Sequence, residues 1–597
     1  MRTADDILNV IRDRGQRRLP LEDVYRQLFK PALYLRAYGR IYRNDGAMTR
    51  GTTPETVDGM SLAKIHEIIE ALRFERYRWT PVRRTHIPKP KQPGKTRPLG
   101  IPTWSDKLLQ EVMRSLLEAY YEPQFSEHSH GFRPDRGCHT ALTTVAKVWR
   151  GTKWFIEGDI KGCFDHIDHH VLLSILREKI HDNRFLRLVA SLLQAGYLED
   201  WRYHPTFSGT PQGGIISPIL SNIYLDRLDQ WGEQTLLPEH NLGRRRQANP
   251  AYTALQHKAY RLRAEGKHEE ARKLRKQLQA LPSVETDDPH YRRLRYVRYA
   301  DDFLLGFVGP KAEAEEIKRK LTTFLHEELK LELSQEKTLI THAQTERARF
   351  LGYDIVARHE DAKHDSLGRR GINRSIGLRI PAEVIEARCR EYMKKGRPIH
   401  RPELEHNDDY SIVAQFQAEY RGYVQYYLLA ENVGWLTKLH WVMERSLLKT
   451  LAHKHQTSVQ TVAKKYAAKR ETAYGPRACL MVQREINGKK RVAYFGGIPL
   501  RQEKTAVPKD QTTRRYFTKR TEIVQRLLAD ACELCGSQTD MEVHHVRKLA
   551  DLKTKSGRAR SYDAQVMAAR KRKTLVLCGN CHRALHAGRL QRKPVAE

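Results

Sequence analysis

The sequence has no apolar run long enough to cross a membrane. Its longest run, residues 303–308, is interrupted by Gly306, whereas a membrane-spanning helix needs about 18 apolar residues. The first fifteen residues contain Asp5 and Asp6 and lack the basic-then-apolar order of a signal peptide. We therefore expect a protein without transmembrane segments that acts in the cytoplasm of a bacterium or inside an organelle.

Acidic residues are also fewer than basic ones. The chain has 71 Asp and Glu against 106 Lys and Arg, a formal net charge of +35. A small neutral substrate gives no reason for this surplus, whereas a polyanion such as nucleic acid does. With 40% hydrophobic residues the chain can build packed cores, which excludes a disordered basic polymer. Its 597 residues predict roughly four domains.

Cysteine is sparse, and its spacing argues against disulfides. Half of the eight cysteines are isolated in the sequence. The other half form two Cys-x-x-Cys pairs near the C-terminus: Cys532 with Cys535, and Cys578 with Cys581. Two such pairs supply the four thiolates that a tetrahedral structural Zn²⁺ site requires.

Three carboxylates stand at the ends of apolar segments. Asp159 follows one such segment, and the adjacent Asp301 and Asp302 separate two others, as at the tip of a hairpin. If they converge, they would repel one another unless cations neutralise them. Two Mg²⁺ ions about 3.5–4 Å apart would do so, and would assist in-line phosphoryl transfer to a 3′-hydroxyl. The alternative is an ordinary turn, because aspartate favours turns.

The surrounding motifs extend this pattern. Five blocks occur in order: HSHGFRPDRGCHTAL at 128–142, SGTPQGGIISPILSNIYLDRLD at 208–229, YADD at 299–302, LSQEKTLI at 333–340 and FLGYDI at 350–355. With them the chain resembles a reverse transcriptase, and specifically the proteins encoded by mobile group II introns, over essentially its whole length. No carboxylate set typical of ribonuclease H follows residue 360, which argues against a retroviral-type enzyme.

The resemblance implies roles for individual residues. Asp159, Asp301 and Asp302 would hold the Mg²⁺ ions. Phe164 would lie beneath the incoming sugar and exclude a 2′-hydroxyl, although it would serve equally as a core aromatic. Four polar residues would contact the nucleotide or its pyrophosphate, or else be solvated charges and turn residues: Lys89, Arg97, Gln212 and Lys337.

The C-terminal half resembles the thumb, or maturase X domain, of the same family. Its tyrosines at 420, 423, 426 and 427 would stack on RNA bases if exposed, but their helical spacing favours core positions for most of them. The basic run 501–520 resembles the family's DNA-binding region, with a solvated linker as the alternative.

The last seventy residues resemble an HNH endonuclease. Here the resemblance makes His544, His582 and His586 ligands of a catalytic divalent metal, and His545 the general base. The family's central Asn would align near Lys573 or Thr574, neither of which is Asn. A structural zinc ribbon with spare histidines is the alternative.

We therefore expect a multidomain α+β protein with right-hand polymerase fingers and palm, an antiparallel palm sheet, a helical thumb and a ββα-metal domain. The expected boundaries are an N-terminal helical extension at 1–80, fingers and palm at 81–365 with a charged helical insertion at 243–290, thumb at 366–470, DNA-binding region at 471–527 and HNH domain at 528–597.

The resemblance implies three activities: copying intron RNA by target-primed reverse transcription, assisting intron splicing, and nicking target DNA. The implied partners are intron RNA, target DNA and dNTPs, with homodimer formation left open. Two alternatives remain: a splicing maturase with dispensable polymerase and endonuclease activity, and a stand-alone nuclease with a decayed polymerase. The intact carboxylates Asp159, Asp301 and Asp302 argue against the first as the only role, and the second predicts DNA cleavage without intron RNA.

Overall fold

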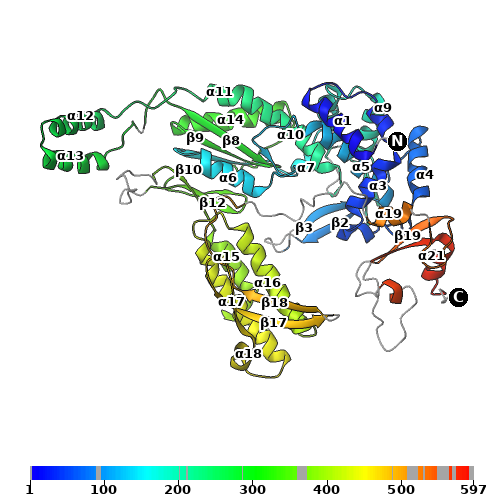
Figure 1. Ribbon diagram of the computed structural model, residues 1–597. Helices are drawn as coiled ribbons and strands as arrows, with labels where there is room; N and C mark the ends of the chain where they lie inside the picture. The colour runs from blue at the N-terminus through cyan, green and yellow to red at the C-terminus, as the bar shows by residue number, and fades with distance from the viewer. Residues whose placement is uncertain are drawn as a thin grey trace.

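The computed structural model describes residues 3–88, 94, 96–200, 202–206, 208–209, 213–285, 287–359, 373–486, 489–506, 522–528, 531–546, 564–567 and 573–589. A central sheet lies between a helical N-terminal region and a thumb that projects to one side, and the C-terminal module lies beside the N-terminal helices (Figure 1). None of the helices in these ranges is long and apolar enough to span a bilayer.

The central, or palm, sheet has five strands in the order β10-β5-β9-β8-β4. Its pairs are antiparallel except β4 with β8. Successive residues of β9 enter different cores, since Phe303 and Leu305 pack with the N-terminal helices and Leu304 packs with the thumb. Burial on both faces explains the continuous apolar run at 303–308. The strands are β4 (Ser129–His130), β5 (Trp154–Asp159), β8 (Arg293–Tyr299), β9 (Asp302–Val308) and β10 (Ile340–His342).

Helices surround α5, which is buried along almost its whole length and begins at the N-cap Thr103. The helices of this region are α1 (Ala4–Gln16), α2 (Val24–Gln27), α3 (Pro31–Ile41), α4 (Leu62–Arg73), α5 (Trp104–Tyr121), α8 (His169–Arg177) and α9 (Asn183–Leu193), with a 3₁₀ turn at Asp45–Met48. A second sheet, in the order β3-β2-β6-β7, contains the basic hairpin: β2 (Val82–Pro88), β3 (Thr96–Ile101), β6 (Tyr197–Glu199) and β7 (Arg202–His204).

The remaining palm helices pack on the central sheet. They are α6 (Cys138–Val148), α7 (Cys163–His166), α10 (Ser217–Trp231), a π-helical turn (Gly232–Leu236), α11 (Leu237–Glu239) and α14 (Lys311–Glu327). Two further helices, α12 (Pro250–Ala264) and α13 (His268–Ala280), form a hairpin that extends from one end of the molecule (Figure 1). Gly266 makes the turn between them at φ 76°.

A three-stranded sheet connects the palm to the thumb: β11 (Ala348–Phe350), β12 (Tyr353–Ala357) and β13 (Ile376–Arg379). The thumb contains four helices and a hairpin that packs on α16. Its elements are α15 (Ala382–Arg390), β14 (Met393–Lys394), β15 (Arg397–Pro398), 3₁₀ turns at Pro402–Leu404 and Val433–Trp435, α16 (Asp409–Tyr426), α17 (Leu436–Lys454), α18 (Val459–Tyr466), β16 (Ala467–Arg470), β17 (Arg477–Ile486) and β18 (Lys489–Gly496).

The C-terminal module consists of α19 (Glu522–Leu528), β19 (Met541–His545), β20 (Thr574–Cys578) and α21 (Gly579–His586). Its sheet gains a third strand, β1 (Met60–Ser61), from the N-terminal region, in register Met60↔Val543. Apolar side chains of the module, including Val543 and Leu527, belong to the same core as the N-terminal helices. The N-terminal helices and the described residues of the C-terminal module therefore pack together.

Candidate polymerase and endonuclease sites

The three predicted carboxylates lie together at one end of the palm sheet. Strand pairing places Asp159, the last residue of β5, directly opposite Asp302, the first residue of β9. One position earlier, Gly158 lies under Phe303, and a Cβ there would be 2.1 Å from the aromatic ring. A side chain at position 158 would therefore force the buried Phe303 ring to move. Asp301 occupies the turn between β8 and β9, next to Ala300, which has φ 54°.

The electrostatics of this site favour a bound cation. Burial raises the pKa of Asp302 to about 7, and the charges of Asp301 and Asp159 add to the rise. Burial likewise raises the pKa of Asp301, with Asp159 adding and Arg97 opposing. Carboxylates that resist ionisation together favour a divalent metal, because its charge replaces their mutual repulsion with attraction. The three side chains thus fit a divalent-metal site.

A buried ion pair fixes the turn that contains Asp301. Arg298 and Asp229 are completely buried and joined through the guanidinium Nε at 2.8 Å. The same guanidinium donates to the carbonyl of Ala300 and to Ser129 Oγ, each at 2.8 Å. Tyr296 donates to Asp229 at 2.8 Å. This network was not predicted from the sequence, because β8 contains three arginines and nothing in the sequence distinguishes Arg298 as the buried one.

Two of the predicted nucleotide-contacting residues that the structure describes, Lys337 and Arg97, interact with the carboxylates, and the third lies on α7, which follows Asp159 in the chain. Lys337 Nζ is 2.9 Å from Asp159 Oδ2, and this hydrogen bond raises the lysine pKa. Arg97 lies on β3, close enough to lower the pKa of Asp301. The half-buried ring of Phe164, on α7, lies edge-on to Phe132 with centroids 6.2 Å apart. The predicted contacts at Lys89 and Gln212 lie outside the described residues.

The four paired cysteines form one cluster in the C-terminal module. The sulfur atoms of Cys532, Cys535, Cys578 and Cys581 lie within 4.8 Å of one another. Burial alone would raise the pKa of the Cys532 thiol, but hydrogen bonds from backbone amides at the knuckle lower it to about 7. Four cysteines from two knuckles fit a tetrahedral metal site.

A second cluster joins three histidines to a carboxylate from the other end of the chain. His544 on β19 and His582 and His586 on α21 converge with Asp58, and one ligand atom from each lies within 4.8 Å of the others. His582 faces the cluster with its Nε2, and its Nδ1 contacts the carboxylate of Glu542. Such a carboxylate contact orients metal-ligating histidines. Burial opposes ionisation of Asp58, yet hydrogen bonds from His544 and His582 hold its pKa well below the usual range. No sequence motif pointed to Asp58.

His545 faces away from this cluster, because neighbouring residues on a strand point to opposite sides. It is only 5% exposed, and its Nε2 lies 2.9 Å from the hydroxyl of Tyr38 on α3. Burial lowers the pKa of His545 to about 3. In this arrangement the predicted general base is covered by the N-terminal region.

Comparisons with known families agree with the order of these sites. The model for "Reverse transcriptase (RNA-dependent DNA polymerase)" matches residues 87–355. The model for "Type II intron maturase" matches residues 382–493, and that for "AI2M/AI1M-like, HNH endonuclease" matches residues 532–582.

Whole-chain relatives complete the comparison. The group II intron-encoded protein LtrA of Lactococcus lactis subsp. cremoris is 39% identical over 584 residues, which cover 94% of this chain and 95% of LtrA. The chain belongs to the group II intron-encoded proteins. The putative COX1/OXI3 intron 1 protein of Saccharomyces cerevisiae is 33% identical over 93% of this chain and 68% of its own. An uncharacterized 91 kDa protein in the cob intron of Schizosaccharomyces pombe is 35% identical over a stretch that covers 98% of this chain and 73% of that protein.

This intron-encoded protein is thus a reverse transcriptase that also carries maturase and HNH endonuclease domains. The maturase region holds the tyrosines that the sequence placed mostly in the core, and the structure confirms this interpretation. Tyr420 and Tyr427 are buried, and Tyr423 and Tyr426 are half-buried. Tyr426 donates to the carbonyl of Leu351 at 2.7 Å and Tyr427 to that of Gly352 at 3.2 Å, so these two rings connect α16 to the palm-side sheet, whereas Tyr420 packs against Phe495 within the thumb.

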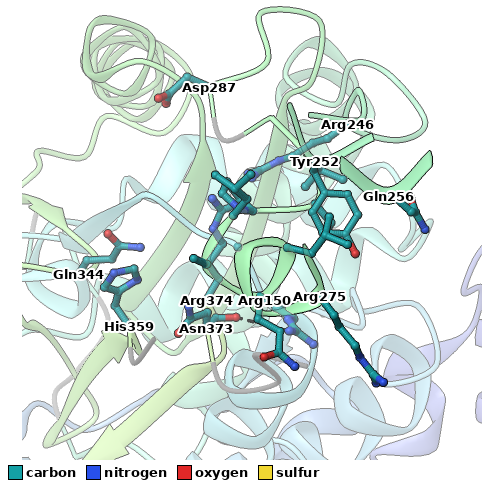
Figure 2. A pocket seen from close by; sticks show the side chains of 18 of the residues that line it. Arg150, Arg246, Tyr252, Gln256, Arg275, Asp287, Gln344, His359, Asn373 and Arg374 are labelled. Carbon is teal, nitrogen blue, oxygen red and sulfur yellow. Dashed lines mark hydrogen bonds between the residues drawn. The ribbon is translucent and has the colours of Figure 1, made fainter. Parts of the chain in front are cut away.

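A large basic cavity separates the α12–α13 hairpin of the intron-encoded protein from its palm. Its volume is about 1300 Å³. Figure 2 shows Arg150, Arg275 and Arg374 around it. Its described lining has six Lys and Arg, adding Lys153, Arg246 and Arg263, against the single carboxylate of Asp287. Such a surface suits a phosphate backbone.

Proposed function

We propose that the palm site polymerises DNA on an RNA template with Asp159, Asp301 and Asp302 as the ligands of two Mg²⁺ ions. When bound, these ions supply Lewis-acid stabilisation of the transferring phosphoryl group. Asp159 and Asp302 hold their ligand oxygens on paired strands, and the turn adds Asp301. The observation that carries this proposal is the convergence of three carboxylates, two of them with raised pKa, at a sheet end.

Side chains around the triad position the dNTP. Arg97 supplies positive charge for the triphosphate, as does Lys89, and Gln212 contacts the nucleotide. Lys337, held 2.9 Å from Asp159, delivers a proton to the departing pyrophosphate. Phe164 excludes nucleotides that carry a 2′-hydroxyl. Arg298 acts as a positioning residue, because it holds the Ala300 carbonyl at 2.8 Å beside Asp301.

The C-terminal module nicks target DNA. His544, His582 and His586 hold the divalent metal, which supplies stabilisation of the scissile phosphate when bound. His545 acts as general base once its imidazole leaves Tyr38, since the hydroxyl contact now occupies its Nε2. Cys532, Cys535, Cys578 and Cys581 hold a structural Zn²⁺ that joins the two knuckles.

The protein works as a ribonucleoprotein with its intron RNA inside the host cell, and primes DNA synthesis from the nicked target. The functional divisions are extension 1–80, fingers and palm 81–365, thumb 366–470, DNA-binding region 471–527 and endonuclease 528–597. The hairpin β17–β18, described above with the thumb, belongs by these divisions to the DNA-binding region and packs on the thumb helix α16, and α19 at the end of that region packs on the endonuclease strands β19 and β20. The basic cavity beside α12–α13 supplies an RNA-binding surface, because six cations there face a single carboxylate. A purely splicing-cofactor role is not favoured, since the reverse transcriptase and endonuclease families both match.

Mg²⁺-dependent extension of a DNA primer on an RNA template tests the polymerase proposal. We expect the wild type to extend the primer and Asp301→Ala to lose at least about a hundredfold in rate, comparable to the loss of one transition-state contact. Intron splicing by the variant should persist, since Asp301 lies at the end of the palm sheet and outside the residues 382–493 that match the maturase family. Equal extension by the variant and wild type would refute the assignment of the metal ligands. The exposed Asp13→Asn in α1 is the matched control.

A further inference from the structure

The endonuclease cluster has one member from outside the C-terminal module, because Asp58 belongs to the N-terminal region whereas the three histidines lie on β19 and α21. It comes from the loop before β1, nearly five hundred positions before the histidines in the sequence. Its carboxylate is only 15% exposed. Oδ1 lies 3.2 Å from His544 Nδ1 and 3.3 Å from His582 Nε2, and Oδ2 lies 2.9 Å from His586 Nε2.

These distances match the separations between ligand atoms in a tetrahedral metal centre. Metal–ligand bonds of about 2.0–2.1 Å place neighbouring ligand atoms about 3.3 Å apart. The ring nitrogens of His544 and His586 are 3.3 and 3.0 Å from His582 Nε2, and the carboxylate contacts of 2.9–3.3 Å match them. All four side chains therefore present ligand atoms at mutual distances that one ion between them would impose.

Hydrogen bonds alone account poorly for the same geometry. His582 Nδ1 already contacts the carboxylate of Glu542. Its Nε2 is approached by two other imidazole nitrogens and by Asp58. A ring nitrogen carries at most one hydrogen or one lone pair, so it cannot satisfy three such neighbours. A shared cation satisfies them all, with Glu542 fixing the ring as metal-site carboxylates do.

Backbone pairing keeps Asp58 in this place. Gly59 N donates to the carbonyl of Val543 at 3.1 Å, and β1 pairs with β19 in the next two positions. The amide of His545 donates to Asp58 Oδ1 at 2.8 Å. Met60 is fully buried in the core that the module shares with the N-terminal helices. The carboxylate is thus carried to the cluster by docking of the two regions.

We propose that Asp58 is the fourth ligand of the endonuclease metal and closes that site while the module is docked. This proposal rests on the proposed metal role of His544, His582 and His586. Catalytic metal sites of this kind keep three protein ligands and an open position, whereas four protein ligands complete a tetrahedron. The same docking covers His545 with Tyr38. A phosphate of target DNA must therefore replace Asp58, and metal binding strengthens the docked, closed state.

Cobalt binding to the full-length protein tests this ligand. Zn²⁺ first fills the four-cysteine site, and Co²⁺ is then titrated while the visible absorption of tetrahedral Co²⁺ is recorded. We expect Asp58→Asn to weaken Co²⁺ binding at least about tenfold and His582→Ala to abolish the absorption. The asparagine keeps an oxygen for the His545 amide, so docking without metal is preserved. Asp13→Asn, in exposed surroundings, should bind as the wild type does.

Hydrogen exchange and DNA nicking supply two further readouts. Added Co²⁺ should slow amide exchange at residues 59–61 in the wild type but not in Asp58→Asn. At saturating metal, Asp58→Asn should nick double-stranded DNA faster than the wild type, because a coordination position is open. If Asp58→Asn bound Co²⁺ and protected residues 59–61 as the wild type does, Asp58 would not be the fourth ligand. If Asp58→Asn nicked DNA more slowly than the wild type, Asp58 would not close the metal site. Retained binding in His582→Ala would instead refute the three-histidine site itself.

Discussion

The polymerase and endonuclease sites are assembled in opposite ways. The polymerase carboxylates lie on two paired strands and the turn next to them, within one sheet. The endonuclease cluster combines a strand and a helix of the C-terminal module with Asp58 from the N-terminal region. Correct folding of the palm is sufficient to form the first site. The second requires two distant segments to dock, so its composition depends on whether they are together.

This difference determines which changes each site tolerates. The polymerase turn is supported from behind by the buried pair Arg298 and Asp229, so disturbance of the palm core should reach the carboxylates directly. The endonuclease module instead contributes part of its own core to the N-terminal helices and adds a four-cysteine cluster. Disturbance of that cluster should abolish nicking while the palm continues to polymerise.

We expect Cys578→Ser to produce the largest difference between the endonuclease and polymerase activities. Removal of one thiolate disrupts the proposed structural Zn²⁺ site, and such metal binding contributes about 10–16 kcal/mol to the folding of small zinc modules. We expect DNA nicking to be lost completely, with faster amide exchange in β19 and β20. Primer extension should stay within about twofold of the wild type, because the palm sheet contains no residue of the module.

Cys479→Ser is the matched control, since Cys479 is also buried but lies on β17 and belongs to no metal-ligand group among the described residues. This variant should nick DNA normally. If Cys578→Ser abolishes nicking and extension together, the two sites are not independent, and the contrast drawn between them is wrong.

Sequence reasoning located the polymerase carboxylates because they adjoin apolar segments and stand among five motifs in the order of a known family, all of which are short-range patterns. It did not find Asp229, whose partner Arg298 is 69 positions away, or Asp58. Both depend on long-range packing, and nothing near either residue in the sequence indicates its partner. The same limit applies to His545, whose side chain was assigned to catalysis although the docked fold buries it against Tyr38. The parallel β4–β8 pair also differs from the expected antiparallel sheet.

A smaller but more local effect is expected from Arg298→Met. Removing one partner of a buried ion pair costs about 3–5 kcal/mol, because the other charge is left without compensation. The free energy of unfolding measured in urea should fall by that amount. Primer extension should also fall at temperatures where the variant remains folded, since the Ala300 carbonyl loses its donor. Nicking should change much less.

Two further variants distinguish the role of Arg298 in positioning the carboxylates from its contribution to stability. Arg187→Met removes an exposed pair with Glu75 and should cost about 1 kcal/mol or less. The double variant Arg298→Met with Asp229→Leu removes both buried charges and should recover much of the stability, but not the extension rate. Full recovery of extension in the double variant would show that Arg298 only stabilises the fold.

The smallest expected effect concerns substrate choice within the polymerase site. Replacement of the Phe164 ring in Phe164→Val should open space for a 2′-hydroxyl, and differences of this size in a binding pocket change discrimination by about 10- to 200-fold. The ratio of dNTP to NTP incorporation, measured as kcat/KM on the same primer and template, should fall by at least about tenfold. Phe132→Val alters the neighbouring ring, which contacts Phe164 edge-on and is 54% exposed, and should leave the ratio nearly unchanged. An equal fall in both variants would show that the pair of rings, rather than Phe164 alone, determines the preference for dNTPs over NTPs. In neither variant should DNA nicking change, because this preference belongs to the polymerase site, which the palm forms by itself.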